Sequence, residues 1–238
     1  SAGVPLVERP SDLLDRVDAV LVESNEGAVH RERATPFLEA GRPVFIDKPF
    51  ASTAADARAL VNLAAQKGVP LFSASSLRFT PEVKAARSVE VDLGPLVGAD
   101  VYAPAVLHPH NPGLLHYGVH GVEMLYALLG PGCAEVSCIF NEDGEVVTGR
   151  WKDGRLGVMR GLRRGTRGYG FTAYGERGIR PATVSLQHLY RDLVGVVVSV
   201  LGGAPSPISA AELIEVVAFQ EAALASAQAG GRPVKLSD

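Results

Sequence analysis

The sequence has little cysteine, and nothing in it indicates a disulfide framework or a structural zinc site. Its 238 residues include two cysteines, Cys133 and Cys138, whereas a structural zinc site needs paired Cys or His ligands at short spacing. The two lie five positions apart in a segment typical of one β-strand, and this odd offset is expected to point their side chains to opposite faces. We therefore expect no disulfide, no metal site and a reducing, cytoplasmic location.

Excess positive charge and long apolar runs are also missing. The chain has 23 Lys plus Arg against 26 Asp plus Glu, a formal net charge of −3, so it has no overall basic field for nucleic acid. The longest apolar stretch, Leu193–Leu201, is far shorter than the roughly 20 residues that cross a bilayer. No targeting segment precedes Val4, so we expect any such peptide to be absent or already removed. Neither nucleic acid nor a membrane is an expected partner.

The first 80 residues have the pattern of an α/β fold. The composition is 47% hydrophobic, and the length allows one large domain or two small ones. Short apolar runs alternate with longer amphipathic segments, as in βα units on a parallel sheet. Thr53 is the expected N-cap of one helix, with Asp56 completing a capping box and Gly68 ending it. The expected strands are Val17–Val22, Val44–Ile46 and Leu71–Ala74, and the expected helices are Ala28–Ala40 and Thr53–Gly68.

Beyond Pro81, Gly-containing turns separate longer alternating segments, which is typical of an antiparallel sheet. Asp153–Gly154 favours a hairpin, and Gly165–Gly170 is expected to be a turn. The expected strands are Val97–Val106, Ala134–Phe140, Glu145–Trp151, Leu156–Leu162 and Tyr169–Tyr174, and the expected helices are Pro112–Leu129, Leu186–Leu201 and Ala210–Ala229. The sequence thus predicts α/β plus α+β: a partial Rossmann-like domain over 1–80 and an α+β substrate and oligomerisation domain over 81–238. The last helix and strand are expected to pack back on the first domain.

Asp47-Lys48-Pro49 follows a buried strand, at the sheet edge where open α/β folds bind ligands. A lysine there can donate a hydrogen bond to a substrate hydroxyl, and the positive charge of an oxidised nicotinamide nearby would lower its pKa. The alternative is a surface lysine paired with Asp47. A three-residue motif is weak evidence, so taken alone it favours the surface lysine.

His116 and His120 lie four apart in a helical pattern, which places two imidazoles on one face. This is the spacing of a metal pair or of two cooperating acid/base groups. A metalloprotease motif would have Glu after the first histidine, where this chain has Tyr117, and Glu123 is the one further ligand in the same stretch. Acid/base chemistry on an alcohol is therefore favoured over a metal-dependent hydrolase. Two histidines hydrogen-bonded in an interface remain the structural alternative.

A loop rich in turn-forming and polar residues, His108–Gly113, precedes that helix. It can line the rim of a pocket with His108 and Asn111. An ordinary loop with Asn111 near a helix N-terminus is the simpler interpretation.

Taken in order along the chain, these features resemble the Gfo/Idh/MocA oxidoreductases, the family of glucose-fructose oxidoreductase and inositol dehydrogenase. Val17–His30 resembles a strand and loop of that family, and Phe37–Pro49 resembles its segment ending in Glu-Lys-Pro, with Asp47 for the Glu. Arg78–Pro81 is similar to the arginine segment that leads into the second domain. His116–His120 is similar to its Asp, three residues, His pattern, and Ala222–Leu236 to its last helix and strand.

The resemblance implies an NAD- or NADP-dependent enzyme that oxidises a hydroxyl, or reduces a ketone, of a sugar, cyclitol or related polyol. It also implies a homodimer or tetramer formed through the antiparallel sheet. The residues expected to act are Lys48, His120 and His116 in catalysis; Ser24, Asn25, Glu26, His30, Asp47 and Pro49 at the cofactor; and Arg78, Tyr117, His108 and Asn111 at the substrate.

The sequence departs from the family in two places. His116 replaces an Asp, which would have held the tautomer of the next histidine and supplied negative charge. No strand with a G-x-G-x-x-G turn precedes Val17, so we expect about 60 residues of the dinucleotide fold to be missing from this chain. Weak or no binding of NAD(H) to this chain follows as an expectation. The rival hypothesis is an inactive binding or scaffold protein derived from the family.

Overall fold

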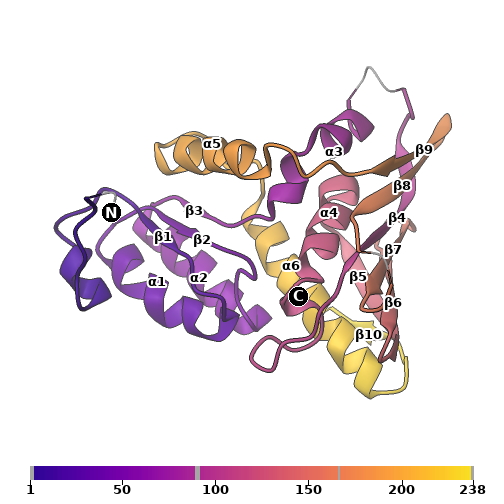
Figure 1. Cartoon of the computed structure of the whole chain (residues 1–238), viewed down its shortest axis with the longest axis horizontal. Coiled ribbons are helices and arrows are strands. Elements are labelled where there is room, and N and C mark those ends of the chain that lie inside the picture. The colour runs from indigo at the N-terminus through magenta and orange to yellow at the C-terminus, as the bar shows by residue number, and fades with distance from the viewer. Residues whose placement is uncertain (1–2, 89–91, 166, 237–238) are drawn as a thin grey trace.

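The structure is a computed structural model that describes residues 3–88, 92–165 and 167–236. It contains two sheets, one of three parallel strands and one of seven mostly antiparallel strands, with helices packed on both (Figure 1). The expected combination of α/β and α+β patterns is therefore confirmed. Thr166, in the segment Gly165–Gly170 that we expect to be a turn, lies outside the described residues.

The parallel sheet has the order β1 (Val20–Val22), β2 (Val44–Ile46) and β3 (Leu71–Phe72). Two of these strands are shorter than predicted. Val20 already pairs with Val44, the first residue of β2, so the residues before Val20 have no partner strand with which to extend the ladder. The short strands end together, and their carboxyl ends form one edge of the sheet.

Helices cover both faces of this sheet. The helices α1 (His30–Glu39) and α2 (Ala54–Lys67) lie on one side, and α5 (Leu189–Leu201) lies on the other (Figure 1). The predicted caps of α2 at Thr53 and Gly68 are confirmed, because Thr53 Oγ1 accepts from the Asp56 N–H and Gly68 has a φ of 66°. The capping box is not formed as predicted, since the Asp56 carboxylate accepts from the Thr53 hydroxyl and not from the Thr53 backbone N–H. Two short 3-10 helices, η1 (Pro10–Leu13) and η2 (Gly27–Val29), complete this part of the chain.

The larger sheet has the order β10-β5-β6-β7-β4-β8-β9, in which β4 and β7 are parallel and all other pairs are antiparallel. The hairpin predicted at Asp153–Gly154 is confirmed, since it joins β6 to β7. The prediction missed β9, whose Arg-Pro-Ala sequence has little β-propensity. The bounds are β4 Leu96–Pro104, β5 Cys133–Asn141, β6 Gly144–Trp151, β7 Leu156–Leu162, β8 Gly170–Gly175, β9 Gly178–Thr183 and β10 Val234–Lys235.

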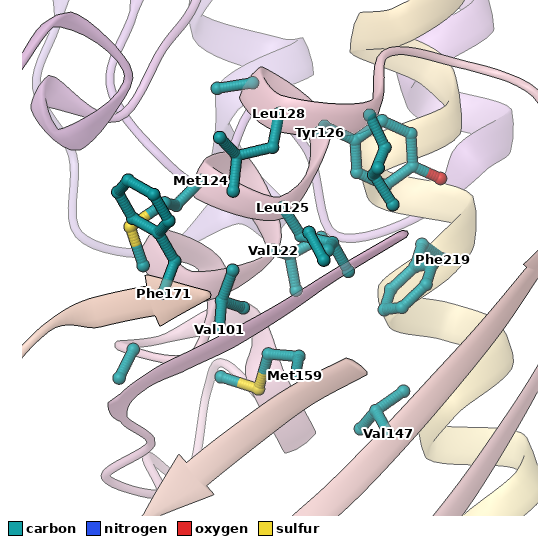
Figure 2. Packing of buried hydrophobic residues seen from close by; sticks show 14 of the residues in the cluster. Val101, Val122, Met124, Leu125, Tyr126, Leu128, Val147, Met159, Phe171 and Phe219 are labelled. Atoms are coloured by element: carbon teal, nitrogen blue, oxygen red, sulfur yellow. The ribbon is translucent and has the colours of Figure 1, made fainter. Parts of the chain in front are cut away.

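One face of this sheet packs on α4 (Val119–Leu129) and α6 (Ala210–Gln228). Figure 2 shows Met124 and Leu125 of α4 and Phe219 of α6 meeting Met159 and other buried side chains of the strands. The remaining helical segments are η3 (Ser76–Phe79), α3 (Pro81–Ala86) and η4 (Gly113–Leu115). No helix in the described parts of the chain is long and apolar enough to cross a membrane.

The continuous helix predicted over Pro112–Leu129 is wrong. The chain forms η4, then bends at His116 and Tyr117, and α4 begins at Val119. At Gly118 a Cβ would lie 2.5 Å from the Leu114 side chain, so the bend depends on glycine at this close approach. His116 therefore lies outside α4 and does not share a helical face with His120.

The opposite-face prediction for the two cysteines is also wrong. The register of β5 against β6 shifts between Cys133 and Glu135, which marks a β-bulge. Because the bulge adds one residue to the strand, residues five positions apart across it point to the same face. Cys133 and Cys138 are therefore both buried in the same core as free thiols.

Helix α6 contributes to both hydrophobic cores. Leu213 and Val217 belong to the core around the parallel sheet, and Val216 and Phe219 belong to the core of the larger sheet. The strand after it, β10, pairs with β5 of the larger sheet. One rigid element thus holds the parallel sheet in place beside α4.

Candidate active site

A cavity of about 630 Å³ lies between the carboxyl edge of the parallel sheet, α4 and α5. Asp47 and Lys48, which follow β2, line one side of it. Tyr117, just before α4, His120 in its first turn, and Tyr169 also line it. Cavities of this size hold small molecules in proteins. The structure thus brings together residues that lie far apart in the sequence and that were singled out separately.

Lys48 is partly buried between two kinds of neighbour. Its Nζ lies 5.8 Å from the centroid of the Tyr117 ring, a cation–π distance. Carboxylates are its other neighbours: the pKa of Glu23 is raised by partial desolvation and by Asp47, while Lys48 opposes that rise. The ammonium group is therefore placed where carboxylates, an aromatic face and the cavity meet.

His120 is held from behind by a hydrogen bond and on its sides by aromatic rings. Ser75 Oγ lies 2.8 Å from its Nδ1, and Tyr117 and Tyr169 make edge contacts at 5.8 and 6.0 Å between ring centroids. Burial, then Lys48, then His116 lower the pKa of His120 to about 3. The imidazole is therefore neutral at physiological pH.

His116 lies behind Tyr117. Its ring stacks on His108 at 4.6 Å between centroids and meets the edge of Tyr117 at 5.0 Å. Its pKa is lowered by burial first, then by His108 and Lys48. His116 is thus electrostatically coupled to Lys48 and His120, while its ring contacts are with other neighbours.

Two expected site residues hold a loop in place. The fully buried His30 has both ring nitrogens at 2.8 Å from carbonyl oxygens, those of Ser24 and Pro49. Asn111 Oδ1 accepts from the Gly27 N–H, and its Nδ2 donates to the carbonyl of Asn25. These side chains fix the segment after β1 against the loop after β2.

The cofactor residues expected in that loop have different surroundings. Asn25 lines the cavity. Ser24 Oγ accepts a hydrogen bond from Arg33, and Glu26 precedes η2 as its N-cap residue. At Gly27 a Cβ would lie 2.9 Å from Pro49 Cγ, so the loop closes tightly on the Pro49 ring.

Arg78 lies apart from this cavity. It is 6% exposed, and its guanidinium donates to the carboxylates of Glu123 on α4 and Glu212 on α6. These two carboxylates outweigh the effect of burial and raise the pKa of Arg78. The substrate-binding role expected for Arg78 gains no support from this placement, because its Nε and Nη2 already donate to buried carboxylates. A structural role fits.

Sequence reasoning missed Ser75, Glu23 and Tyr169. Glu23 and Tyr169 line the cavity, and Ser75 contacts His120. Glu23 follows a predicted strand directly, so the rule that placed Lys48 could have found it. No local signal marks Ser75 or Tyr169. In the described parts of the chain, no three His, Cys, Asp or Glu side chains are grouped to hold a metal ion.

The fold and the position of the cavity define the class: a Rossmann-like α/β part joined to an α+β part, with the site where the parallel strands end. Residues 1–75 match the sequence model of the family described as "Oxidoreductase family, NAD-binding Rossmann fold". The resemblance to the Gfo/Idh/MocA oxidoreductases is therefore confirmed.

Two curated relatives carry enzyme names. The 1,5-anhydro-D-fructose reductase of Ensifer adhaerens is 32% identical over 162 residues, which cover 62% of this chain and 47% of that protein. The scyllo-inositol 2-dehydrogenase (NADP(+)) IolU of Bacillus subtilis is 36% identical over 70 residues, 29% of this chain and 21% of that protein. The chain thus spans less than half the length of these relatives.

Solved structures share the fold over almost the whole chain. GenD2 from gentamicin A biosynthesis, in complex with NAD, has a TM-score of 0.86 and 22% identity, covering 99% of this chain and 84% of that one. A myo-inositol dehydrogenase from Corynebacterium glutamicum has a TM-score of 0.80 and 18% identity, covering 98% and 84%. These likenesses establish the fold.

Proposed function

We propose that the protein containing this chain is an NAD(P)-dependent oxidoreductase that interconverts a hydroxyl and a ketone on a sugar, cyclitol or related polyol. The observation that carries the proposal is that Lys48, which follows β2, and His120, from α4, line one cavity at the carboxyl edge of the parallel sheet. The reductase and dehydrogenase names of the relatives give the same reaction class.

In this proposal, Lys48 and His120 converge on the oxygen that changes between hydroxyl and ketone. The Lys48 ammonium donates to that oxygen and stabilises negative charge on it. His120, neutral because of its lowered pKa, forms the second hydrogen bond to that oxygen. When a ketone is reduced, hydride goes to its carbon and Lys48 passes a proton to its oxygen; in the oxidation of a hydroxyl, Lys48 takes that proton back. His116, which lies behind Tyr117, acts on Lys48 and His120 through electrostatic interactions.

The residues after β1 and β2 fit the nicotinamide end of a dinucleotide. Asn25, Asp47 and Lys48 line the cavity, and the loop carrying Asn25 is fixed by His30 and Asn111 rather than free to collapse into it. Pro49 closes this edge through its contact at Gly27. Bound there, the cofactor supplies hydride exchange with the substrate carbon.

A polyol substrate suits the rest of the cavity. Tyr117 and Tyr169 present apolar ring faces with hydroxyl groups, and Asn25, Asp47 and Glu23 add polar groups. Sugar rings combine apolar C–H faces with hydroxyls and are matched by such walls. His108 would act on the substrate through His116, on which it stacks.

The inactive scaffold alternative is less favoured. A scaffold has no need for a lysine and a neutral histidine that line one cavity.

We also propose a homo-oligomer through the outer face of the larger sheet, where Ile139 and Ile179 are 73% and 67% exposed. Light scattering of the purified protein tests this, and a monomer would contradict it.

The test of function uses the full-length protein with NAD⁺ or NADP⁺ and a panel of inositols, aldoses and anhydro sugars. Appearance of reduced nicotinamide with one of them is expected, and its loss in Lys48→Ala but not in Lys67→Ala, an exposed lysine ending α2, assigns it to this cavity. Calorimetry of this chain with NADH is a second test, with weak or absent binding expected. Turnover unaffected by Lys48→Ala would contradict the proposal.

A further inference from the structure

Ser75 is a fully buried serine at the carboxyl edge of the parallel sheet, and its hydroxyl lies 2.8 Å from Nδ1 of His120. It comes two residues after Ser73 and serves as N-cap of η3. No part of the proposed chemistry uses its hydroxyl directly. Its position behind His120 raises the question of what the contact does to the imidazole.

The hydrogen bonds around Ser75 fix the direction of that contact. Its Oγ accepts from the Leu77 N–H at 3.2 Å, so one lone pair is already used. The hydroxyl proton is buried away from water and must find an acceptor within the protein. The acceptor that the structure places beside it is Nδ1 of His120. Nδ1 then carries no proton, and in a neutral imidazole the proton is on Nε2.

The neighbouring histidine does not supply this restraint. His116 makes its ring contacts with His108 and Tyr117, outside helix α4. The rings of Tyr117 and Tyr169 confine His120 from the sides, but an aromatic edge contact does not select a tautomer. Ser75 is thus placed to select one.

We infer that Ser75 is a positioning residue that holds His120 in the Nε2–H tautomer, so that the imidazole presents a hydrogen-bond donor to the cavity. With the Lys48 ammonium, this places two donors on the reacting oxygen, which matches a ketone oxygen better than a hydroxyl that must itself donate. The preference for the ketone form rests on the proposed function, whereas the tautomer assignment rests on the contacts of Ser75 and is independent of it.

Nuclear magnetic resonance of the chain labelled with ¹⁵N-histidine tests the tautomer directly at neutral pH. The His120 signals are assigned by their loss in His120→Asn. We expect the nitrogen shifts of an unprotonated Nδ1 and a protonated Nε2 in the wild-type chain, and a mixture of tautomers in Ser75→Ala. A protonated Nδ1 in the wild type would overturn the inference, whether or not any variant folds.

Kinetics of the full-length enzyme give the second test. Ser75→Ala is expected to lower kcat by about 10- to 100-fold and to raise KM for the ketone more than KM for the alcohol. Ser75→Thr keeps the hydroxyl, fits the extended backbone at this position and should restore most of the activity.

Ser73→Ala is the matched control, because Ser73 is equally buried on the same segment and its hydroxyl has no partner among the described residues. Equal kinetic effects of Ser73→Ala and Ser75→Ala would show a packing effect and overturn the positioning role. If no substrate is turned over at all, the proposed function fails while the tautomer measurement still decides this inference.

Discussion

Two cationic side chains follow neighbouring parallel strands, and their surroundings give them opposite roles. Lys48 follows β2 and lines the cavity with Tyr117 and His120. Arg78 lies beyond β3 and is buried between the carboxylates of Glu123 and Glu212. A charge buried against carboxylates of the same chain helps hold the fold together, while a charge at a cavity wall is available to a ligand. The difference between them lies in their neighbours, because both are basic residues near a strand end.

The largest effect on activity is expected at the cavity. Lys48→Ala in the full-length enzyme should lower kcat by roughly 10²- to 10⁴-fold, the range for positioned acid/base groups, while the free energy of unfolding changes little. Steady-state kinetics and urea denaturation measure the two quantities. A variant that unfolds but keeps its activity per folded molecule would place Lys48 with Arg78 as a structural residue.

The largest effect on stability is expected at the buried ion cluster. Arg78→Leu leaves two carboxylates buried without their cation and should lower the free energy of unfolding by about 3–5 kcal/mol. Urea denaturation measures this. Arg150→Leu is the matched control, because its pair with Glu135 is exposed and contributes about 1 kcal/mol or less. A stable Arg78→Leu enzyme with a raised KM would instead restore its predicted role at the substrate.

Acid should destabilise the cavity wall through His120. Its folded-state pKa is about 3, whereas an unfolded histidine has a pKa of about 6.5, so between these values the unfolded chain binds more protons. The contribution of His120 to the free energy of unfolding is therefore fully present above about pH 6.5 and is lost as the pH falls towards 3. At pH 5 the loss amounts to up to about 2 kcal/mol.

Urea denaturation of wild type and His120→Asn at pH 6.5 and at pH 5 measures how much of the free energy of unfolding each loses between these pH values. The control is His188→Asn, since His188 is exposed and its left-handed backbone, with a φ of 61°, accepts asparagine. An identical loss of stability in wild type and His120→Asn would remove His120 as the cause.

A smaller effect is expected when His116 becomes Asp. The change replaces one of the groups that lower the pKa of His120 and adds a carboxylate near Lys48, so the acid limb of the pH–rate profile should move up by about one unit while activity survives. If His116→Asp abolishes activity in a folded enzyme while His120→Ala retains it, His116 rather than His120 acts on the reacting group and the assigned roles are wrong.

Much of the fold could be predicted because its signals are local. The caps at Thr53 and Gly68 and the Asp153–Gly154 hairpin depend on residues a few positions apart, and each is confirmed. The errors arose where the tertiary structure overrides local pattern. A bulge at Cys133–Glu135 changed which face Cys138 occupies, and a tight packing of Gly118 on Leu114 broke the expected helix.

The sequence by itself determined which residues follow the parallel strands, and so it placed Lys48 at the sheet edge. The tertiary structure alone decided which polar groups meet there. Ser75 and His120 are 45 residues apart, and Arg78 and Glu212 are 134 apart, yet both pairs are in hydrogen-bond contact. Such contacts depend on how helices α4 and α6 pack beside the sheet. Because hydrogen bonds and ion pairs act over a few ångströms in space, local sequence patterns do not encode them.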